Sequence, residues 1–265
     1  MSATRQVNQA LGQRQAFLSE QSGLEVFLMH SLIIHMSGSS KRAANVEHLL
    51  YSLPNAEVTE AVNGREAVAH NIFPLRKGDL HAPSYPFPLS PGEVGCFLSH
   101  RACWQRIVDK GWDYALIVED DLALQQAEWQ ATLSLIETHA DTDSFIRLPA
   151  KRRESPAAII DQNGAAKLFL PRVIGLQTVA QVVGRNAAEN LLAASTTIDR
   201  PVDTFLQMHW IHGQRIQTIL PNGVSELTDE LGGSTIQKRK SGNKLSREFK
   251  RALYRAHVSA RPQTA

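Results

Sequence analysis

The stretch 114–121 reads YALIVEDD, an apolar run followed directly by three carboxylates. A continuous apolar run of this length is typical of a β-strand that is covered on both faces, so the sequence predicts a strand over 114–118. Ligands of open α/β sheets bind outside the carboxyl ends of the strands. The pattern therefore places Glu119, Asp120 and Asp121 where a ligand would bind.

The segments before this strand predict a βαβ unit. Residues 26–34 read as a strand, apolar residues recur at helical spacing over 43–53, and 57–62 read as a second strand. Residues 71–91 contain five prolines, which predicts an irregular loop. A helix is expected over 92–110, because helical spacing continues there until a glycine at 111.

The segments after 121 continue the alternation of helices and strands. Helices are predicted over 129–137 and over 186–194, the second with Asn186 as its cap. Strands are predicted over 145–148 and 178–183, and the Asn163-Gly164 turn indicates a hairpin or excursion within 150–175. The expected fold class is α/β, with a mixed sheet flanked by helices in a single domain.

Composition excludes several classes of protein. With 265 residues, 43% of them hydrophobic and 20% charged, the chain is neither disordered nor collagen-like.

Cys96 and Cys103 would lie about 10.5 Å apart along a helix, too far for a disulfide. They also lack zinc-ligand spacing, and we interpret them as buried thiols in a reducing compartment. The apolar stretch 26–36 is well short of the roughly 20 residues that span a bilayer, which favours a cytoplasmic protein.

Three neighbouring carboxylates at a strand end repel one another unless a cation or hydrogen-bond donors offset their charge. A hard divalent metal that bridges Glu119, Asp120 or Asp121 to a diphosphate suits this position. The alternative is that Asp120 or Asp121 only caps the next helix.

Two further segments carry candidate catalytic residues. In the stretch GEVGCFLSH at 92–100, Glu93 and His100 share one helix face, and Gly95 permits close approach of a neighbouring segment. The alternative is a first-turn carboxylate and a core histidine. Asp203 follows Pro201, where it would serve either as a cap or as a general base.

The C-terminal part of the chain is strongly basic. Residues 238–261 carry a net charge of +8, which leaves −6 for the rest of the chain. Within 244–258 an apolar stripe falls at helical spacing, at Leu245, Phe249, Ala252, Leu253 and Ala256. Such a helix could lie on an anionic bilayer, bind nucleic acid, or pack on the domain. The predicted divisions are an extension over 1–25, a domain over 26–236 and a basic tail over 237–265.

Together these motifs resemble glycosyltransferase family 25, which includes bacterial lipooligosaccharide galactosyltransferases and animal collagen galactosyltransferases. The GEVGCFLSH stretch at 92–100 and the Glu-Asp-Asp at 119–121, at this separation, are the specific part of the resemblance. Supporting stretches are IIHM at 33–36, Ser39 with Arg42, AVNG at 61–64, Trp104 and PVD at 201–203. The resemblance covers about residues 26–236.

The resemblance implies a GT-A-like (Rossmann-like) fold and transfer of galactose from UDP-galactose, with inversion, to a glycan or lipid-linked oligosaccharide. It also implies Mn²⁺ or Mg²⁺, held by Asp121 with Asp120 or Glu119. Asp203 is the first choice for the general base and Glu93 the second, and His100 completes the catalytic candidates. The candidates for donor binding are Arg42, Asn63, Glu119, Asp120, Ser234, Lys238 and Arg239.

Rival functions remain open at this point. One is a non-enzymatic adaptor that binds a membrane or nucleic acid through the basic tail, and another is a metal-dependent phosphohydrolase. For the transferase no nucleic-acid partner is expected. Its expected location is the cytoplasm, with peripheral binding to the inner face of the cytoplasmic membrane.

Overall fold

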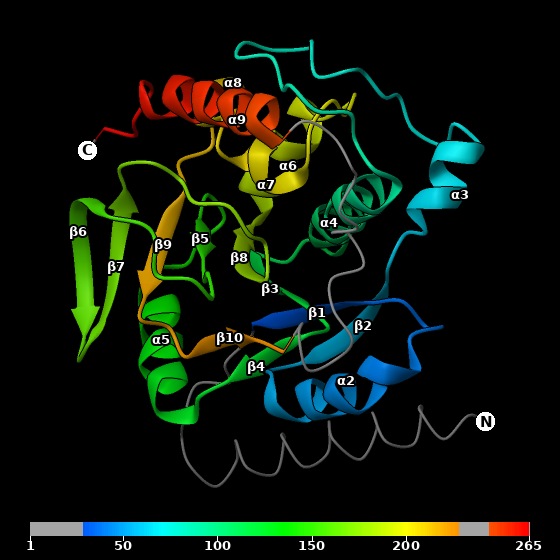
Figure 1. Cartoon of the computed structure of the whole chain (residues 1–265). Helices are drawn as coiled ribbons and strands as arrows, with labels where there is room; N and C mark the ends of the chain where they lie inside the picture. Colours follow the sequence, from blue (N-terminus) through cyan, green and yellow to red (C-terminus); the bar gives the residue numbers. More distant parts are fainter. Residues whose placement is uncertain (1–28, 228–243, 265) are drawn as a thin grey trace, which may run out of the picture.

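Eight strands form one mixed sheet at the centre of the computed structural model, which describes residues 29–227 and 244–264 (Figure 1). The strand order is β2-β1-β3-β8-β5-β9-β7-β6, and β10 pairs with β4 in a separate ribbon. The strands of the main sheet are β1 (His30–His35), β2 (Ala56–Glu60), β3 (Tyr114–Glu119), β5 (Phe145–Arg147), β6 (Pro156–Asn163), β7 (Ala166–Pro171), β8 (Ala180–Gly184) and β9 (Gln217–Leu220). The ribbon consists of β4 (Leu122–Leu124) and β10 (Val224–Glu226).

The pairing directions bring several strand ends to one edge of the sheet. Strands β2, β1 and β3 are parallel, so their carboxyl ends lie side by side. Strand β8 runs antiparallel to β3, and Ala180 at its start pairs with Val118. The end of β3 and the start of β8 therefore meet at this edge, which we call the acidic edge because Glu119, Asp120 and Asp121 lie there.

Helices cover both faces of the sheet, because alternate residues of each strand point to opposite faces. On β3, Ala115 and Ile117 pack into one core cluster, and Leu116 and Val118 into the other. The first face is covered by α3 (Gly64–Ala69), α4 (Pro91–Lys110), α6 (Arg185–Ala194) and α7 (Val202–Leu206). The second face is covered by α2 (Ser40–Ser52) and α5 (Gln126–His139). The short α8 (His209–His212) follows α7.

Helix α4 carries two of the candidate residues, and its position is fixed at both ends. Ser90 and Glu93 form a capping box at the start, and Gly111 ends the helix with a φ of 64°. A Cβ at Gly95 would lie 2.6 Å from the Val62 carbonyl oxygen, closer than real contacts allow. The predicted close approach at Gly95 is therefore confirmed, and it seats α4 against the segment that follows β2.

The predicted fold class is confirmed, with a mixed sheet flanked by helices in one domain. The hairpin predicted within 150–175 is also confirmed as β6 and β7, with Gly164 at φ 58° in its turn. The prediction that Asn186 caps its helix is wrong. Gly184 holds that position, and the Asn186 amide instead donates to Thr142 and Asp143.

The C-terminal helix α9 (Lys244–Ser259) lies on the outside of the molecule, near α8 (Figure 1). Its buried residues are Tyr254 and Val258, and Arg200 donates to the Tyr254 hydroxyl at 3.2 Å. Two large residues of the predicted apolar stripe face away from the domain, with Phe249 71% and Leu253 50% exposed. Of the alternatives for this helix, packing on the domain is therefore confirmed, but the docked face carries Tyr254 and Val258 and not Phe249 or Leu253.

No helix in the described part of the chain is long and apolar enough to cross a membrane. The predicted extension 1–25 and the segment 228–243 lie outside the described residues, so the predicted division of the chain at these segments stays a prediction.

Candidate active site

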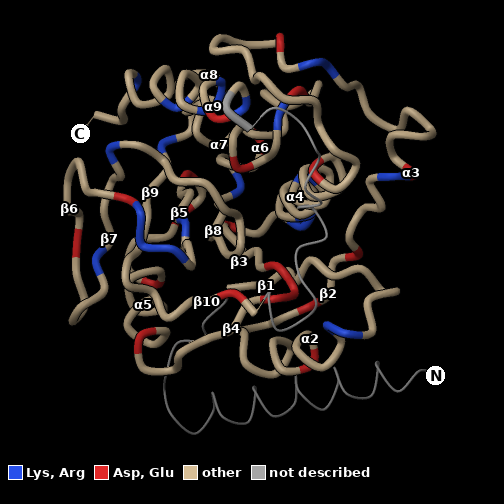
Figure 2. Tube along the Cα trace, in the orientation of Figure 1, with Lys and Arg blue, Asp and Glu red and all other residues tan. Residues whose placement is uncertain are grey.

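Glu119 is the last residue of β3, and Asp120 and Asp121 follow it at the acidic edge; Figure 2 shows acidic residues here beside β1. The two aspartates are buried, at 6% and 5% exposure, whereas the Glu119 side chain is partly exposed. Two buried neighbouring carboxylates need compensating charge.

Arg42 of α2 supplies that charge. Its guanidinium contacts Asp120 and lies 3.1 Å from Asp121 Oδ2. Burial by itself would lower the pKa of Arg42, but the hydrogen bond to Asp120 and the charge of Asp121 outweigh it and raise the pKa. Arg42 contacts Oδ1 of Asp120, and His35 Nδ1 lies 2.7 Å from Oδ2 of the same carboxylate. Asn45 donates to the carbonyls of Asp120 and Leu122, so α2 also fixes the backbone of this loop.

Glu119 points to a different set of neighbours. The Thr178 hydroxyl donates to its Oε1 at 2.7 Å, and His100 Nε2 lies 3.6 Å from the same oxygen. Burial by itself would raise the pKa of Glu119, but the contacts with His100 and Thr178 outweigh it and leave the pKa lowered. Glu119 is therefore held in its ionised form.

The three carboxylates do not share one ligand position. Among the described residues, the group whose ligand atoms converge within 4.8 Å is Cys96, His100 and Glu119. Asp120 and Asp121 are both in contact with Arg42 instead. As arranged here, the predicted ligands of Mn²⁺ or Mg²⁺ do not form a ready site, and the metal stays a prediction. The alternative that Asp120 or Asp121 caps the next helix is wrong, since the N-cap of α5 is Gln125.

Asp203 lies in the first turn of α7, partly exposed, with both carboxylate oxygens oriented by donors. Oδ1 accepts from the Thr204 backbone N–H at 2.7 Å, and Oδ2 accepts from the Gln177 N–H at 3.3 Å. Burial raises the pKa of Asp203 above its ordinary value. A partly exposed carboxylate with a raised pKa has the properties of a general base.

The structure places Glu93 in a structural role. Its Oε2 accepts from the Ser90 N–H at 2.7 Å and from the Ser90 hydroxyl at 2.8 Å. His100 is fully buried, and its Nδ1 lies 2.8 Å from the Gln181 side-chain amide. Burial is the main reason that the pKa of Cys96 is raised, and the charges of Glu119, Asp203 and Glu93 raise it further. These three candidates therefore share one electrostatic environment around Cys96.

The remaining donor-binding candidates are more dispersed. Asn63 is exposed and caps α3 by accepting from the Arg65 N–H at 3.1 Å. It follows β2 and therefore lies on the carboxyl side of the parallel strands. Ser234, Lys238 and Arg239 lie outside the described residues.

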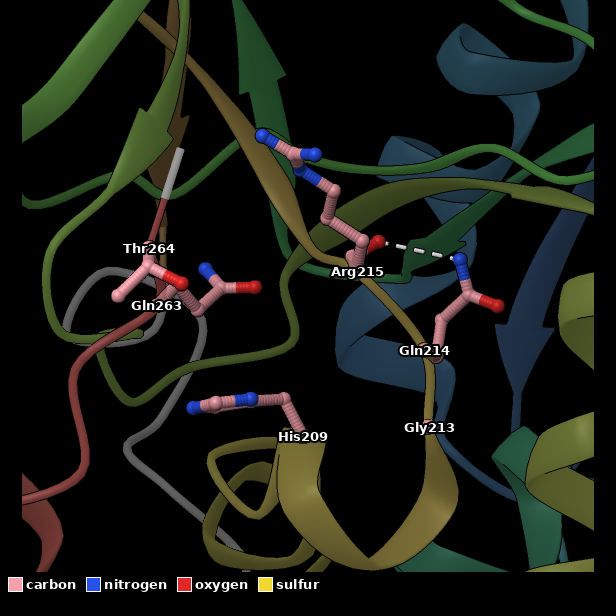
Figure 3. Close-up of a pocket in the computed structure, with 6 residues that line it drawn as sticks. All are labelled: His209, Gly213, Gln214, Arg215, Gln263 and Thr264. Carbon is pink, nitrogen blue, oxygen red and sulfur yellow. Dashed lines mark hydrogen bonds between the residues drawn. The ribbon is translucent and has the colours of Figure 1, made fainter.

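One cavity of about 150 Å³ lies apart from these residues. It is lined by residues of α8, the segment after it and the C-terminal end, and Figure 3 shows the Gln214 amide donating to the Arg215 carbonyl at its wall. Gln263 closes it by bonding to the backbone N–H and carbonyl of Ile216. The cavity shares no residue with the acidic edge and is a product of C-terminal docking.

The fold is that of an α/β protein with carboxylates at the carboxyl ends of its parallel strands, which is the edge where open α/β sheets generally bind ligands. Comparison with known families makes the class specific. The sequence model of glycosyltransferase family 25 (LPS biosynthesis protein) matches residues 29–206. The chain belongs to this family, and the match contains every described residue predicted for the site.

Individual relatives cover smaller parts. Human procollagen galactosyltransferase 2 is 25% identical over 192 residues, which cover 65% of this chain and 29% of that protein. Zebrafish (Danio rerio) procollagen galactosyltransferase 1 is 34% identical over 108 residues, 38% of this chain and 17% of that protein. A rat protein named probable inactive glycosyltransferase 25 family member 3 is 33% identical over 99 residues, 35% of this chain and 17% of that protein. The chain thus spans less than a third of the length of these relatives.

Proposed function

We propose that this chain is a glycosyltransferase that moves galactose from UDP-galactose to a hydroxyl group of a glycan or lipid-linked oligosaccharide. The observation that supports it most directly is the family match over residues 29–206, which spans the acidic edge and Asp203. The galactose donor is proposed from relatives named procollagen galactosyltransferases. One relative is named inactive, so turnover has to be measured rather than assumed from the family.

Asp203 is the proposed general base. Its carboxylate would take the proton of the acceptor hydroxyl as the oxygen attacks the anomeric carbon. The new bond from oxygen to the anomeric carbon forms on the face opposite the leaving UDP, which departs with the electron pair of the broken bond. Attack opposite the leaving group gives inversion. Burial around Asp203 supports this role, because a raised pKa makes the carboxylate a stronger base.

Arg42 is the proposed contact for the donor diphosphate, since a guanidinium binds phosphate oxygens through charge-assisted hydrogen bonds. Its present contacts with Asp120 and Asp121 hold it at the acidic edge. Metal dependence is proposed from the family resemblance. Its test is donor binding by calorimetry with Mn²⁺ and with EDTA, where equal affinity would argue against a metal requirement.

The experiment that tests the activity is a transfer assay with UDP-galactose and a panel of short glycan acceptors. Formation of a galactosylated product together with UDP supports the proposal. Release of inorganic phosphate without any acceptor would favour the phosphohydrolase. Absence of turnover with every nucleotide sugar and acceptor, in a folded protein, would favour the non-enzymatic adaptor.

We also propose an anionic lipid surface as the partner of α9. The docked face of the helix carries Tyr254 and Val258, and Phe249 lies about 180° around the helix from Val258. Phe249 and Leu253 are exposed, as are the basic residues Lys250 and Arg255. An outward apolar stripe with basic neighbours is the pattern of a helix that lies in a membrane interface. Its charge complements anionic headgroups, and a lipid-linked acceptor would be found there.

A further inference from the structure

Three potential metal ligands meet between α4 and the end of β3, although their sequence patterns predict a different role for each of them. Cys96 and His100 are four residues apart on α4 and therefore lie on one face of the helix. Glu119 reaches the same point from β3. The Cys96 sulfur, a His100 ring nitrogen and a Glu119 oxygen all lie within 4.8 Å of one another.

His100 provides an independent observation that points to a ligand. The residue is fully buried, and its Nε2 has no hydrogen-bond partner in residues 29–227 and 244–264. Its nearest charged atom is Glu119 Oε1 at 3.6 Å. This separation is too long for a hydrogen bond. It is close to the roughly 3.4 Å that separates two ligands of a tetrahedral zinc ion with bonds of about 2.1 Å.

The other ring nitrogen of His100 is already supported. Nδ1 lies 2.8 Å from the side-chain amide of Gln181, a residue only 1% exposed. A side-chain amide carries both a donor and an acceptor, so a turn of its end group lets Gln181 accept from Nδ1–H. That tautomer leaves the Nε2 lone pair directed toward Glu119. Metal-bound histidines are oriented by second partners of this kind.

We propose that Cys96, His100 and Glu119 form a binding site for a borderline-soft divalent metal ion, Zn²⁺ in particular. Thiolate sulfur, imidazole nitrogen and carboxylate oxygen are the three ligand types of zinc, and three protein ligands leave a fourth position open. The site shares Glu119 with the predicted site for Mn²⁺ or Mg²⁺, whose ligands are oxygens only, but its other two ligands are a sulfur and a nitrogen from α4. It also does not depend on sugar transfer, because binding is measured directly.

Binding would release one proton. The Cys96 thiol loses its hydrogen as the sulfur–metal bond forms, and no electron is transferred. Burial, followed by the charges of Glu119 and Asp203, raises the pKa of this thiol. The apparent affinity for Zn²⁺ should therefore rise about tenfold per pH unit near neutral pH, as expected for release of one proton.

The test uses the full chain without a histidine tag and Co²⁺ as an optical substitute for Zn²⁺. One equivalent of Co²⁺ should produce sulfur-to-cobalt charge-transfer absorption and the ligand-field bands of tetrahedral cobalt, and Zn²⁺ should abolish both. Cys96→Ser should remove the charge-transfer absorption. Cys103→Ser is the matched control, because Cys103 is a buried thiol on the same helix outside the cluster, and it should leave the spectrum unchanged.

Further variants separate loss of a ligand from loss of the fold. His100→Gln and Glu119→Gln should each weaken Zn²⁺ binding at least tenfold by calorimetry, with circular dichroism spectra that match the parent chain. The proposal is overturned if the parent chain shows no charge-transfer absorption. It is also overturned if the absorption survives Cys96→Ser, or if the two glutamine variants bind Zn²⁺ as the parent does.

Discussion

The backbone N–H of Gln177 donates to Asp203 Oδ2 at 3.3 Å, and Gln177 itself has a positive φ of 93°. A non-glycine residue in this conformation costs on the order of 1–3 kcal/mol and persists only where its surroundings hold it. Here its side chain donates to Glu226 at 2.7 Å and accepts from the Lys151 N–H at 3.2 Å, and Arg147 donates to its carbonyl at 3.0 Å. The strained residue is therefore a positioning residue for Asp203.

Gln177→Ala should lower kcat for transfer about tenfold while leaving the KM for the donor close to that of the parent. The variant loses the two side-chain contacts that hold the positive φ, so its N–H should turn away from Asp203. Gln177→Gly should keep more activity than Gln177→Ala, because glycine adopts positive φ without a steric cost. Equal losses in both variants would show that the side chain acts in another way.

Asp203→Asn should reduce turnover by about 10²–10⁴-fold with donor binding little changed, since a general base acts mainly in the transition state. Steady-state kinetics and calorimetry with UDP measure the two quantities. Glu93→Gln is the comparison variant, and it should lose stability through its capping box more than turnover. If Glu93→Gln abolishes turnover while Asp203→Asn retains it, the general base is Glu93 instead.

The pH profile should carry the signature of Asp203. The base must be deprotonated, and burial raises its pKa, so kcat/KM should fall as the pH is lowered through a value above about 3.9, the ordinary pKa of aspartate. The acid limb should be absent from the residual activity of Asp203→Asn. An acid limb that is identical in this variant would assign the titration to another group.

Arg42→Gln should destabilise the fold by on the order of 3 kcal/mol, because it leaves the buried Asp120 and Asp121 without their guanidinium partner. The double variant Arg42→Gln with Asp120→Asn should be more stable than Arg42→Gln alone, since it removes a buried charge that has lost its guanidinium partner. Urea denaturation measures both. Arg76→Gln is the matched control, because the Arg76–Asp79 pair is exposed and should contribute little.

The sequence predicts the parts of this site that depend on local pattern. The apolar run before Glu119 predicts a buried strand, and the position of the three carboxylates at the carboxyl edge of the sheet follows from that strand alone. Gln177 and Thr178 were missed as site residues, because they reach Asp203 and Glu119 only through the antiparallel pairing of β8 with β3. The six-residue helix α3 was missed because it is too short to show a helical period.

The docked face of α9 shows a second limit of pattern alone. An apolar stripe predicts that a helix has a buried face but leaves open what covers that face. Here the domain binds Tyr254 through Arg200, whereas Phe249 and Leu253 remain outside. The orientation could only come from tertiary contacts, and it makes the stripe available to a lipid surface.

Substitutions on the outward face of α9 should weaken binding to vesicles that contain phosphatidylglycerol. Phe249→Ser with Leu253→Ser removes the apolar contact, and Lys250→Gln with Arg255→Gln removes two charges. Each basic residue near an anionic surface contributes on the order of 1 kcal/mol, and the contribution falls as salt rises. Arg247 and Arg251 are kept, because both lie over the Phe87 ring and help to dock the helix. Cosedimentation at two salt concentrations measures the loss.

The matched control for the apolar pair is Ile159→Ser, because Ile159 on β6 is 55% exposed, close to the 50% of Leu253. This control should bind anionic vesicles as the parent chain does, and no variant should bind phosphatidylcholine vesicles. All variants should keep the melting temperature of the parent, since the docked residues Tyr254 and Val258 are unchanged.

A dimer that is detected by analytical ultracentrifugation and is lost in Phe249→Ser with Leu253→Ser would assign this face to a second copy of the chain. If all these variants still bind anionic vesicles as the parent chain does, α9 is excluded as the lipid-binding element.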